Sequence, residues 1–181
     1  MKSIPCTDWP SVLQDPSGLR SGASNGLRHS RRIARGQTMI IDKGLGPCAF
    51  TDLLATAGDY VDVVKFGFGT APLYPTDTLK GKITKAKQQG ITVMPGGTLL
   101  ETAVYRNAVT AFFDTICKLG FGGVEVSDGT IELSRKRRTE LIKEGKERGL
   151  RVMTEYGKKL SGSTIDADML AKTAEADWAA G

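Results

Sequence analysis

Several residues and motifs that define common enzyme classes are scarce or absent in this chain. Its 181 residues include one histidine, His29, which argues against a histidine-based catalytic triad or a histidine-rich metal site. The three cysteines, Cys6, Cys48 and Cys117, are widely spaced and form no CxxC pair, so they fit reduced thiols better than disulfides or a zinc site. Cys48 and Cys117 are expected to be buried in helices rather than to act as nucleophiles. No apolar run approaches the roughly 18 residues of a membrane span, and the first ten residues lack a signal-peptide core. These absences predict a cytoplasmic protein with no membrane partner.

The basic residues are not arranged as is typical of nucleic-acid-binding proteins. The formal net charge is +5, and the basic residues occur in small groups at 28–35 and 135–138 without interleaved aromatic residues. The second group, RKRR, begins a predicted helix and is interpreted as a solvated face or as an attraction for anionic substrates. Nucleic acid is therefore not an expected partner.

A regular spacing of predicted strand ends dominates the chain. Lys65, Pro95, Glu125 and Glu155 are separated by 95−65 = 30, 125−95 = 30 and 155−125 = 30 residues. Each follows a short run rich in β-branched residues, and each is followed by glycine and a polar stretch of helix length. About 30 residues is the size of one strand plus its crossover helix. The spacing therefore predicts repeated βα units, whose functional side chains gather at the carboxyl ends of the strands.

Residues 1–36 are predicted to form an irregular leader, and residues 37–181 one domain. The predicted strands cover residues 38–41, 61–65, 91–94, 122–126 and 150–154. The predicted helices cover residues 47–58, 76–89, 99–105, 108–119, 134–148 and 163–180. The last helix is expected to bury an apolar stripe of Ile165, Met169, Leu170 and Ala174.

The strands are apolar on both faces, as in a parallel sheet covered on both sides. An open doubly wound sheet and part of an eight-unit barrel both fit this pattern. No GxGxxG or Walker motif follows the first strand, which disfavours the nucleotide-binding forms of the open sheet. The chain ends at Gly181, where a sixth strand is expected, so we predict a (β/α)8 barrel of which about five βα units are present.

The predicted strand ends carry acids, lysines and glycines that would converge on one rim. The acids are Asp42, Glu125 and Glu155, and the lysines are Lys43, Lys65 and Lys158. Carboxylates hold Mg²⁺ beside phosphorylated substrates, lysines neutralise phosphate or transfer protons, and amides of glycine-rich turns suit phosphate oxygens. Any single one of these residues also fits a solvated loop, and Asp128 also fits the start of the next helix through the helix dipole. Together they indicate metal-assisted chemistry on a small phosphorylated acid.

Five stretches make the chain recognisable. They are DKGLGP (42–47), DYVDVVKFGFGT (59–70), GITVMPGGTLLE (90–101), LGFGGVEVSDGTIELS (119–134) and LRVMTEYGKK (150–159). In order and without large gaps, residues 36–181 resemble the phosphosulfolactate synthases, lyases that add sulfite to phosphoenolpyruvate on the pathway to coenzyme M. The resemblance implies a (β/α)8 TIM barrel, dependence on Mg²⁺ and the product (2R)-phosphosulfolactate. Members of that family continue through three further βα units.

With the substrates that the resemblance implies, each rim residue receives an expected role. Asp42 and Glu125 are expected to hold Mg²⁺. Lys158 is the first candidate for protonating C2, Lys65 the second, and Glu155 either orients Lys158 or joins the metal shell. The expected binding groups for phosphate or sulfite are Lys43, Lys65 and the amides of Gly96, Gly97 and Gly129, with Asp128 beside them.

The same residues are also compatible with other functions. One is an aldolase-type barrel in which Lys65 or Lys158 forms a Schiff base, and another is a non-catalytic stress or interaction protein. Five units would leave strand edges unpaired, so inactivity, aggregation and self-association into a homo-oligomer are open for the chain as well.

Overall fold

Short parallel strands form where β-branched and apolar residues are concentrated. In the computed structural model, which describes residues 36–159, 162 and 164–181, each strand is four residues long. The strands are Met39–Asp42 (β1), Val63–Phe66 (β2), Thr92–Pro95 (β3), Gly123–Val126 (β4) and Arg151–Thr154 (β5). The helices are Pro47–Ala57 (α2), Thr76–Gln88 (α3), Gly97–Tyr105 (α4), Val109–Leu119 (α5), Arg135–Glu147 (α6) and Ala167–Ala180 (α7). Two short 3₁₀ turns, Gly58–Tyr60 (η2) and Ala71–Leu73 (η3), flank β2.

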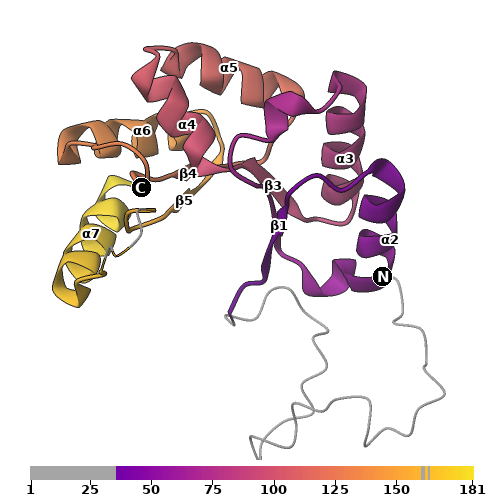
Figure 1. The fold of residues 1–181 in the computed structure, drawn as a ribbon, viewed down its shortest axis with the longest axis horizontal. Helices are drawn as coiled ribbons and strands as arrows, with labels where there is room; N and C mark the ends of the chain where they lie inside the picture. Colours follow the sequence, from indigo (N-terminus) through magenta and orange to yellow (C-terminus); the bar gives the residue numbers. More distant parts are fainter. Residues whose placement is uncertain (1–35, 160–161, 163) are drawn as a thin grey trace, which may run out of the picture. The chain divides into compact units, whose positions relative to one another are not determined.

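The strands lie in chain order and are parallel. β1, β2 and β3 form one hydrogen-bonded ladder, and β4 and β5 form another. Between the two ladders, the Gly122 amide donates to the Val93 carbonyl at 3.0 Å, so that β4 follows β3 along the sheet (Figure 1). Each strand is followed by at least one helix, which confirms a partial (β/α) barrel.

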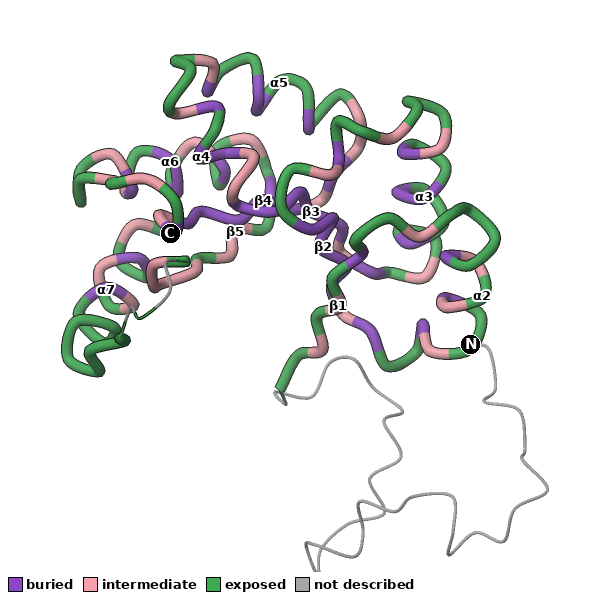
Figure 2. Tube along the Cα trace, viewed as in Figure 1, coloured by how far each residue is buried: buried purple, intermediate pink, exposed green. Residues whose placement is uncertain are grey.

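The core lies between the strands and the helices. Val64 and Phe66 of β2 and Val124 and Val126 of β4 belong to the hydrophobic cluster that the helices complete. The alternate side chains face the opposite, inner side of the sheet. Figure 2 shows buried residues along β2, β3 and β4 and more exposed residues on β1 and β5. The prediction of strands apolar on both faces therefore holds for the outer face, whereas the inner face combines the apolar Val63 and Met94 with the charged Lys65 and Glu125.

Helix ends follow local capping chemistry, which explains why the predicted bounds were close. The Ser134 hydroxyl accepts a hydrogen bond from the Arg137 amide at 3.2 Å and starts α6. Gly120 ends α5 with a φ of +90°, a left-handed conformation that glycine adopts at little cost. Asp166 caps α7 by accepting from the Met169 amide at 2.8 Å.

Two expectations about helix burial are wrong. The predicted apolar stripe of α7 is exposed at Ile165, Met169 and Leu170, because the helix instead buries Thr173 and Asp177 against the arginines of α6. Cys48 and Cys117 are exposed rather than buried. Cys48 precedes the buried Phe50 by two positions, a rotation of about 200° that places their side chains on opposite faces of α2.

Gln37–Gly181 form one compact unit. The predicted leader, with His29 and Cys6, lies outside the described residues apart from Gly36. Within the described part of the chain, no helix has the length and apolarity to cross a membrane.

Candidate functional site

A buried ion pair lies on the inner face of the sheet. Lys65 Nζ on β2 contacts Glu125 Oε1 on β4 at 2.7 Å, and the two side chains are 10% and 5% exposed. The second oxygen, Oε2, accepts the Gly97 amide at 2.6 Å. A side chain at position 97 would overlap the Ser127 hydroxyl and approach Glu125 to 3.0 Å, so the contact requires glycine. The structure thus brings together three of the predicted site residues: Lys65, Glu125 and Gly97.

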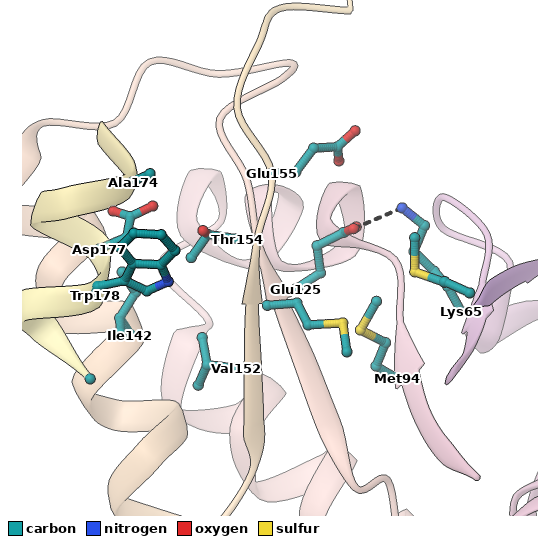
Figure 3. A pocket seen from close by; sticks show the side chains of 13 residues that line it. Lys65, Met94, Glu125, Ile142, Val152, Thr154, Glu155, Ala174, Asp177 and Trp178 are labelled. Carbon is teal, nitrogen blue, oxygen red and sulfur yellow. Dashed lines mark hydrogen bonds and ion pairs between the residues drawn. The ribbon is translucent and has the colours of Figure 1, made fainter. Parts of the chain in front are cut away.

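The ion pair borders a cavity of about 560 Å³. Lys65, Met94, Glu125 and Glu155 lie on one side of β5, whereas Val152, Thr154, Asp177 and Trp178 lie on the other (Figure 3). This division follows from strand alternation, which sends residues 152 and 154 to the face opposite 153 and 155. The inner side therefore offers one ammonium and two carboxylates to a bound molecule.

Glu155 is the carboxylate of this cavity with unused bonding capacity. Its Oε2 is buried and has no hydrogen-bond partner among the described residues. Lys159 lies 3.5 Å from that oxygen, which is longer than a charge-assisted hydrogen bond. Lys159, the neighbour of Lys158 in the sequence, forms this contact with Glu155.

Asp42 is enclosed by other groups of the protein. Its Oδ1 accepts from the amides of Gly44 and Leu45 at 2.9 and 2.8 Å and from the Tyr74 hydroxyl at 3.1 Å. Its Oδ2 forms an ion pair with Lys82, and the two side chains are 0% and 2% exposed. Lys82 also donates to the Leu45 carbonyl at 2.7 Å and to the Tyr74 hydroxyl at 3.0 Å. This pair fixes the loop after β1.

Aromatic rings complete the surroundings of Lys82. Its ammonium lies 4.8, 5.0 and 4.2 Å from the ring centres of Phe50, Phe66 and Tyr74, within the range of cation–π attraction. Burial would raise the pKa of Asp42, but the bonds from Lys82 and the backbone outweigh it and hold that pKa below its usual range. Burial and the neighbouring Asp42 carboxylate raise the pKa of Tyr74 to about 12.

These contacts decide where a divalent cation fits. Asp42 does not fit as a ligand, because both oxygens are occupied and its side chain does not reach solvent. Glu125 already receives Lys65 and the Gly97 amide. Glu155, whose buried Oε2 has no hydrogen-bond partner among the described residues and lies 3.5 Å from Lys159, fits a cation that completes its shell from substrate and water, as Mg²⁺ commonly does. In the described part of the chain, no three His, Cys, Asp or Glu residues are grouped to hold a metal unaided.

The glycine amides predicted to hold phosphate already have acceptors. The Gly96 amide donates to the Phe66 carbonyl at 2.8 Å, and the Gly97 amide to Glu125. The Gly129 amide donates to Glu101 at 3.1 Å. In this structure the three amides that were expected to bind an anion therefore donate to acceptors within the chain. Lys43 is exposed, with its ammonium 5.5 Å from the ring centre of Phe68, and remains available to a ligand at the rim.

Glu101 on α4 is a buried carboxylate that fixes the loop after β4. It accepts from the Ser127 and Thr130 hydroxyls, from the Gly129 amide at 3.1 Å and from the Thr130 amide at 2.7 Å. Burial would raise its pKa, but these donors outweigh that effect and lower it. The loop that carries Asp128 is thus set by a residue of another βα unit.

The free energy of unfolding is expected to fall steeply in acid. The pKa values of Asp42 and Glu101 are lowered in the folded state, so the unfolded chain binds protons first as the pH falls. Their contribution is complete above the unfolded values of about 4 and is lost as the pH falls through the lower folded values. Urea unfolding between pH 7 and pH 3 measures this slope. Glu101→Gln should flatten it, whereas Glu140→Gln on the exposed face of α6 should not. An unchanged slope in Glu101→Gln would contradict the assignment.

Lys158 and Asp128 face a different cavity from Lys65. Lys158 Nζ donates to the carbonyls of Asp128 and Ile131, each at 2.8 Å, and pairs with Glu132 at 2.9 Å. Its second carboxylate neighbour, Asp128, lies at 3.8 Å. Lys158 lines a cavity with Arg135 and Arg138 rather than the one beside Glu125. The structure therefore separates the first predicted proton donor from the second.

The sequence analysis missed Lys82, Glu101 and the pairing of Arg138 with Asp177. Lys82 lies within a polar helix, but it shares the face of Leu79, Ile83 and Ala86, and that spacing could have indicated burial. Arg138 belongs to the RKRR group read as solvated, yet it is only 3% exposed. Its salt-bridge partner is 39 residues away, so no local signal indicated it.

Comparison with known proteins places this arrangement in a family. The model of the (2R)-phospho-3-sulfolactate synthase (ComA) family matches residues 27–181. The phosphosulfolactate synthase of Methanocaldococcus jannaschii is 45% identical over 126 residues, which cover 70% of this chain and 50% of the relative. That of Methanothermobacter thermautotrophicus is 39% identical over 132 residues, covering 73% and 51%.

A third relative is bacterial. The phosphosulfolactate synthase of Bacillus subtilis is 34% identical over 152 residues, covering 84% of this chain and 57% of the relative. The chain thus spans about half the length of the curated relatives it matches. The family model covers most of the chain, including all five strands and the Lys65–Glu125 pair. This chain belongs to the (2R)-phospho-3-sulfolactate synthase (ComA) family.

Proposed function

We propose that the inner-face site binds phosphoenolpyruvate and sulfite and adds sulfite to C3, with Mg²⁺, to form (2R)-phospho-3-sulfolactate. The observation that carries this proposal is the buried Lys65–Glu125 pair beside an open cavity. Family membership supplies the substrates, since the matched relatives are named phosphosulfolactate synthases. A fixed ammonium in a partly desolvated site suits a substrate that carries a phosphate and a carboxylate.

The reaction needs a proton donor as well as charge stabilisation. The lone pair on the sulfur of sulfite forms the C3–S bond, and the C2=C3 π electrons move to C2, where the carboxylate delocalises them. Lys65 Nζ then gives a proton to C2 and regains one from water. We assign this role to Lys65 rather than Lys158, because Lys65 borders the cavity beside Glu125 and Glu155. Glu125 keeps the Lys65 side chain oriented through its 2.7 Å contact.

Mg²⁺ would contribute by neutralising the charge of the substrate oxygens during the addition. Glu155 is the residue that we propose for holding it, since its Oε2 is buried without a hydrogen-bond partner among the described residues. Lys43, exposed at the end of β1, would attract the anionic substrates toward the rim.

The test is formation of the product by the purified chain. The chain is incubated with phosphoenolpyruvate, sulfite and Mg²⁺, and phosphosulfolactate is measured by mass spectrometry. The Methanocaldococcus jannaschii relative serves as the positive control. We expect product in the presence of Mg²⁺ and a large loss of product after addition of EDTA.

The outcomes separate the alternatives. Product from the relative but not from this chain would mean that the 126 residues they share do not hold the whole site. Trapping of a carbonyl substrate on Lys65 by borohydride would favour a Schiff-base enzyme. Absence of both product and phosphoenolpyruvate binding would favour an interaction protein built on the same barrel.

A further inference from the structure

A second cavity lies at the start of α6, between the loops that follow β4 and β5 and the side of α7. Its volume is about 470 Å³, and its lining includes three cationic side chains, Arg135, Arg138 and Lys158. Asp128 is the anionic side chain among the described residues of the lining. The reaction proposed for Lys65 uses none of these four residues.

Arg138 is anchored on one edge and leaves the other edge open. Its Nε and Nη2 donate to the carboxylate of Asp177 at 2.9 and 2.8 Å, and Nη2 also donates to the Glu155 carbonyl at 3.1 Å. Its Nη1 is buried and has no hydrogen-bond acceptor among the described residues. Nη1 forms an ion pair with the Asp128 carboxylate at 3.5 Å. A buried guanidinium nitrogen without an acceptor costs free energy that a ligand oxygen would recover.

Arg135 and Lys158 are held in place beside it. Arg135 donates from Nη1 to Asp177 and from Nη2 to Thr173, both at 3.1 Å, while 47% of its side chain stays exposed. A guanidinium carries five N–H donors, so these two bonds leave donors for a ligand. Lys158 is fixed by the carbonyls of Asp128 and Ile131, and its ammonium also pairs with the exposed Glu132 at 2.9 Å.

A purely structural network that ties α6 to α7 explains part of this arrangement. The Asp177 carboxylate pairs with one edge of each arginine, and these two ion pairs explain why Asp177 is buried. It does not account for the unbonded Nη1 of Arg138 or for a cavity against which all three cations lie. Pre-oriented guanidinium groups around a cavity match the geometry of a tetrahedral or pyramidal oxyanion.

We propose that this cavity is an oxyanion site, which binds phosphate or a group of similar shape and charge through Arg135, Arg138 and Lys158. Arg138 also contacts Asp177 and the Glu155 carbonyl, and both Asp177 and Glu155 line the first cavity. The two cavities therefore share a wall. The oxyanion can be the phosphate of a substrate or a free anion; only the first source rests on the proposed function.

The test is calorimetric titration of the purified chain with inorganic phosphate at constant ionic strength. We expect saturable binding that Arg135→Gln weakens by roughly tenfold or more, the usual effect of losing a charged hydrogen-bond donor. Arg137→Gln is the matched control, since it removes the same charge from α6 at a residue that pairs with Glu140 outside the cavity. The control should bind phosphate within about twofold of the parent chain. Arg135 is half exposed, so its variant should fold, which its urea midpoint checks.

Absence of phosphate binding, or equal weakening in Arg135→Gln and Arg137→Gln, would overturn the proposal in favour of diffuse charge attraction. Competition then identifies the source: displacement of phosphate by phosphoenolpyruvate assigns the site to a substrate, and failure to displace it assigns the site to a separate anion. Phosphate binding without sulfite addition would sustain this site while refuting the proposed function. Sulfite addition without phosphate binding would do the reverse.

Discussion

Lys65→Met is expected to lower the rate of sulfite addition by about a hundredfold to ten-thousandfold, the range observed for loss of a general acid. The substitution keeps the length and apolar stem of the side chain but removes the ammonium that lies 2.7 Å from Glu125. Without it, the site loses the proton donor that we propose for C2 and a fixed positive charge for the proposed substrate. The rate is measured by mass spectrometry of phosphosulfolactate, under the conditions in which the parent chain forms product.

Stability must be separated from catalysis in this variant. Removing one partner of a buried ion pair costs about 3–5 kcal/mol, because the other charge is left without compensation. The double variant Lys65→Met with Glu125→Gln removes both charges and should recover much of that stability while remaining inactive. Lys80→Met, on the exposed face of α3, is the control with the same change of charge. Parental turnover in the folded double variant would remove Lys65 from the reaction.

Lys82→Met is expected to destabilise the chain by about 3–5 kcal/mol, because it leaves Asp42 buried and without its cationic partner. Lys82 also holds the Leu45 carbonyl and the Tyr74 hydroxyl and lies against three aromatic rings. These contacts have no substitute in the variant, since methionine donates no hydrogen bond. The urea midpoint, or loss of a cooperative transition, measures the effect.

The same helix offers a matched control. Lys85 lies one turn after Lys82, but it is exposed and donates to the Thr51 hydroxyl at 2.7 Å. Lys85→Met should change the free energy of unfolding by less than about 0.5 kcal/mol, as is usual for surface sites. The double variant Lys82→Met with Asp42→Asn should be more stable than Lys82→Met alone. Equal midpoints for the Lys82 and Lys85 variants would show that the buried pair does not hold the loop after β1.

Local signals account for what the sequence predicted well. Strand positions followed from β-branched runs, and helix ends from caps such as Ser134 and Gly120, whose effects act within four residues. The 30-residue spacing indicated parallel βα units, and parallel strands bring their carboxyl ends to one edge. Lys65 and Glu125 were expected on one rim, and strands β2 and β4 place them on the same face, where they form an ion pair that the sequence did not predict.

Tertiary contacts account for what the sequence could not predict. Lys65 and Lys158 are equivalent as lysines near strand ends, but backbone carbonyls of the loop after β4 hold Lys158 in another cavity. Asp42 was interpreted as a metal ligand because no local signal indicated its ion-pair partner. That partner, Lys82, lies 40 residues further along the chain (82−42 = 40). The glycine amides were assigned to an anion because the carboxylates of Glu101 and Glu125 that occupy them come from other βα units.

The Lys65–Glu125 contact also has a mechanical consequence. The backbone ladder is continuous from β1 to β3 and from β4 to β5, and this contact spans the break, with Lys65 on one ladder and Glu125 on the other. It therefore acts as a tie between two halves of the sheet that share few backbone bonds. An anion that draws Lys65 away from Glu125 must also loosen that tie. For this reason, anion binding in the cavity and the rigidity of the sheet between β3 and β4 both depend on the Lys65–Glu125 ion pair.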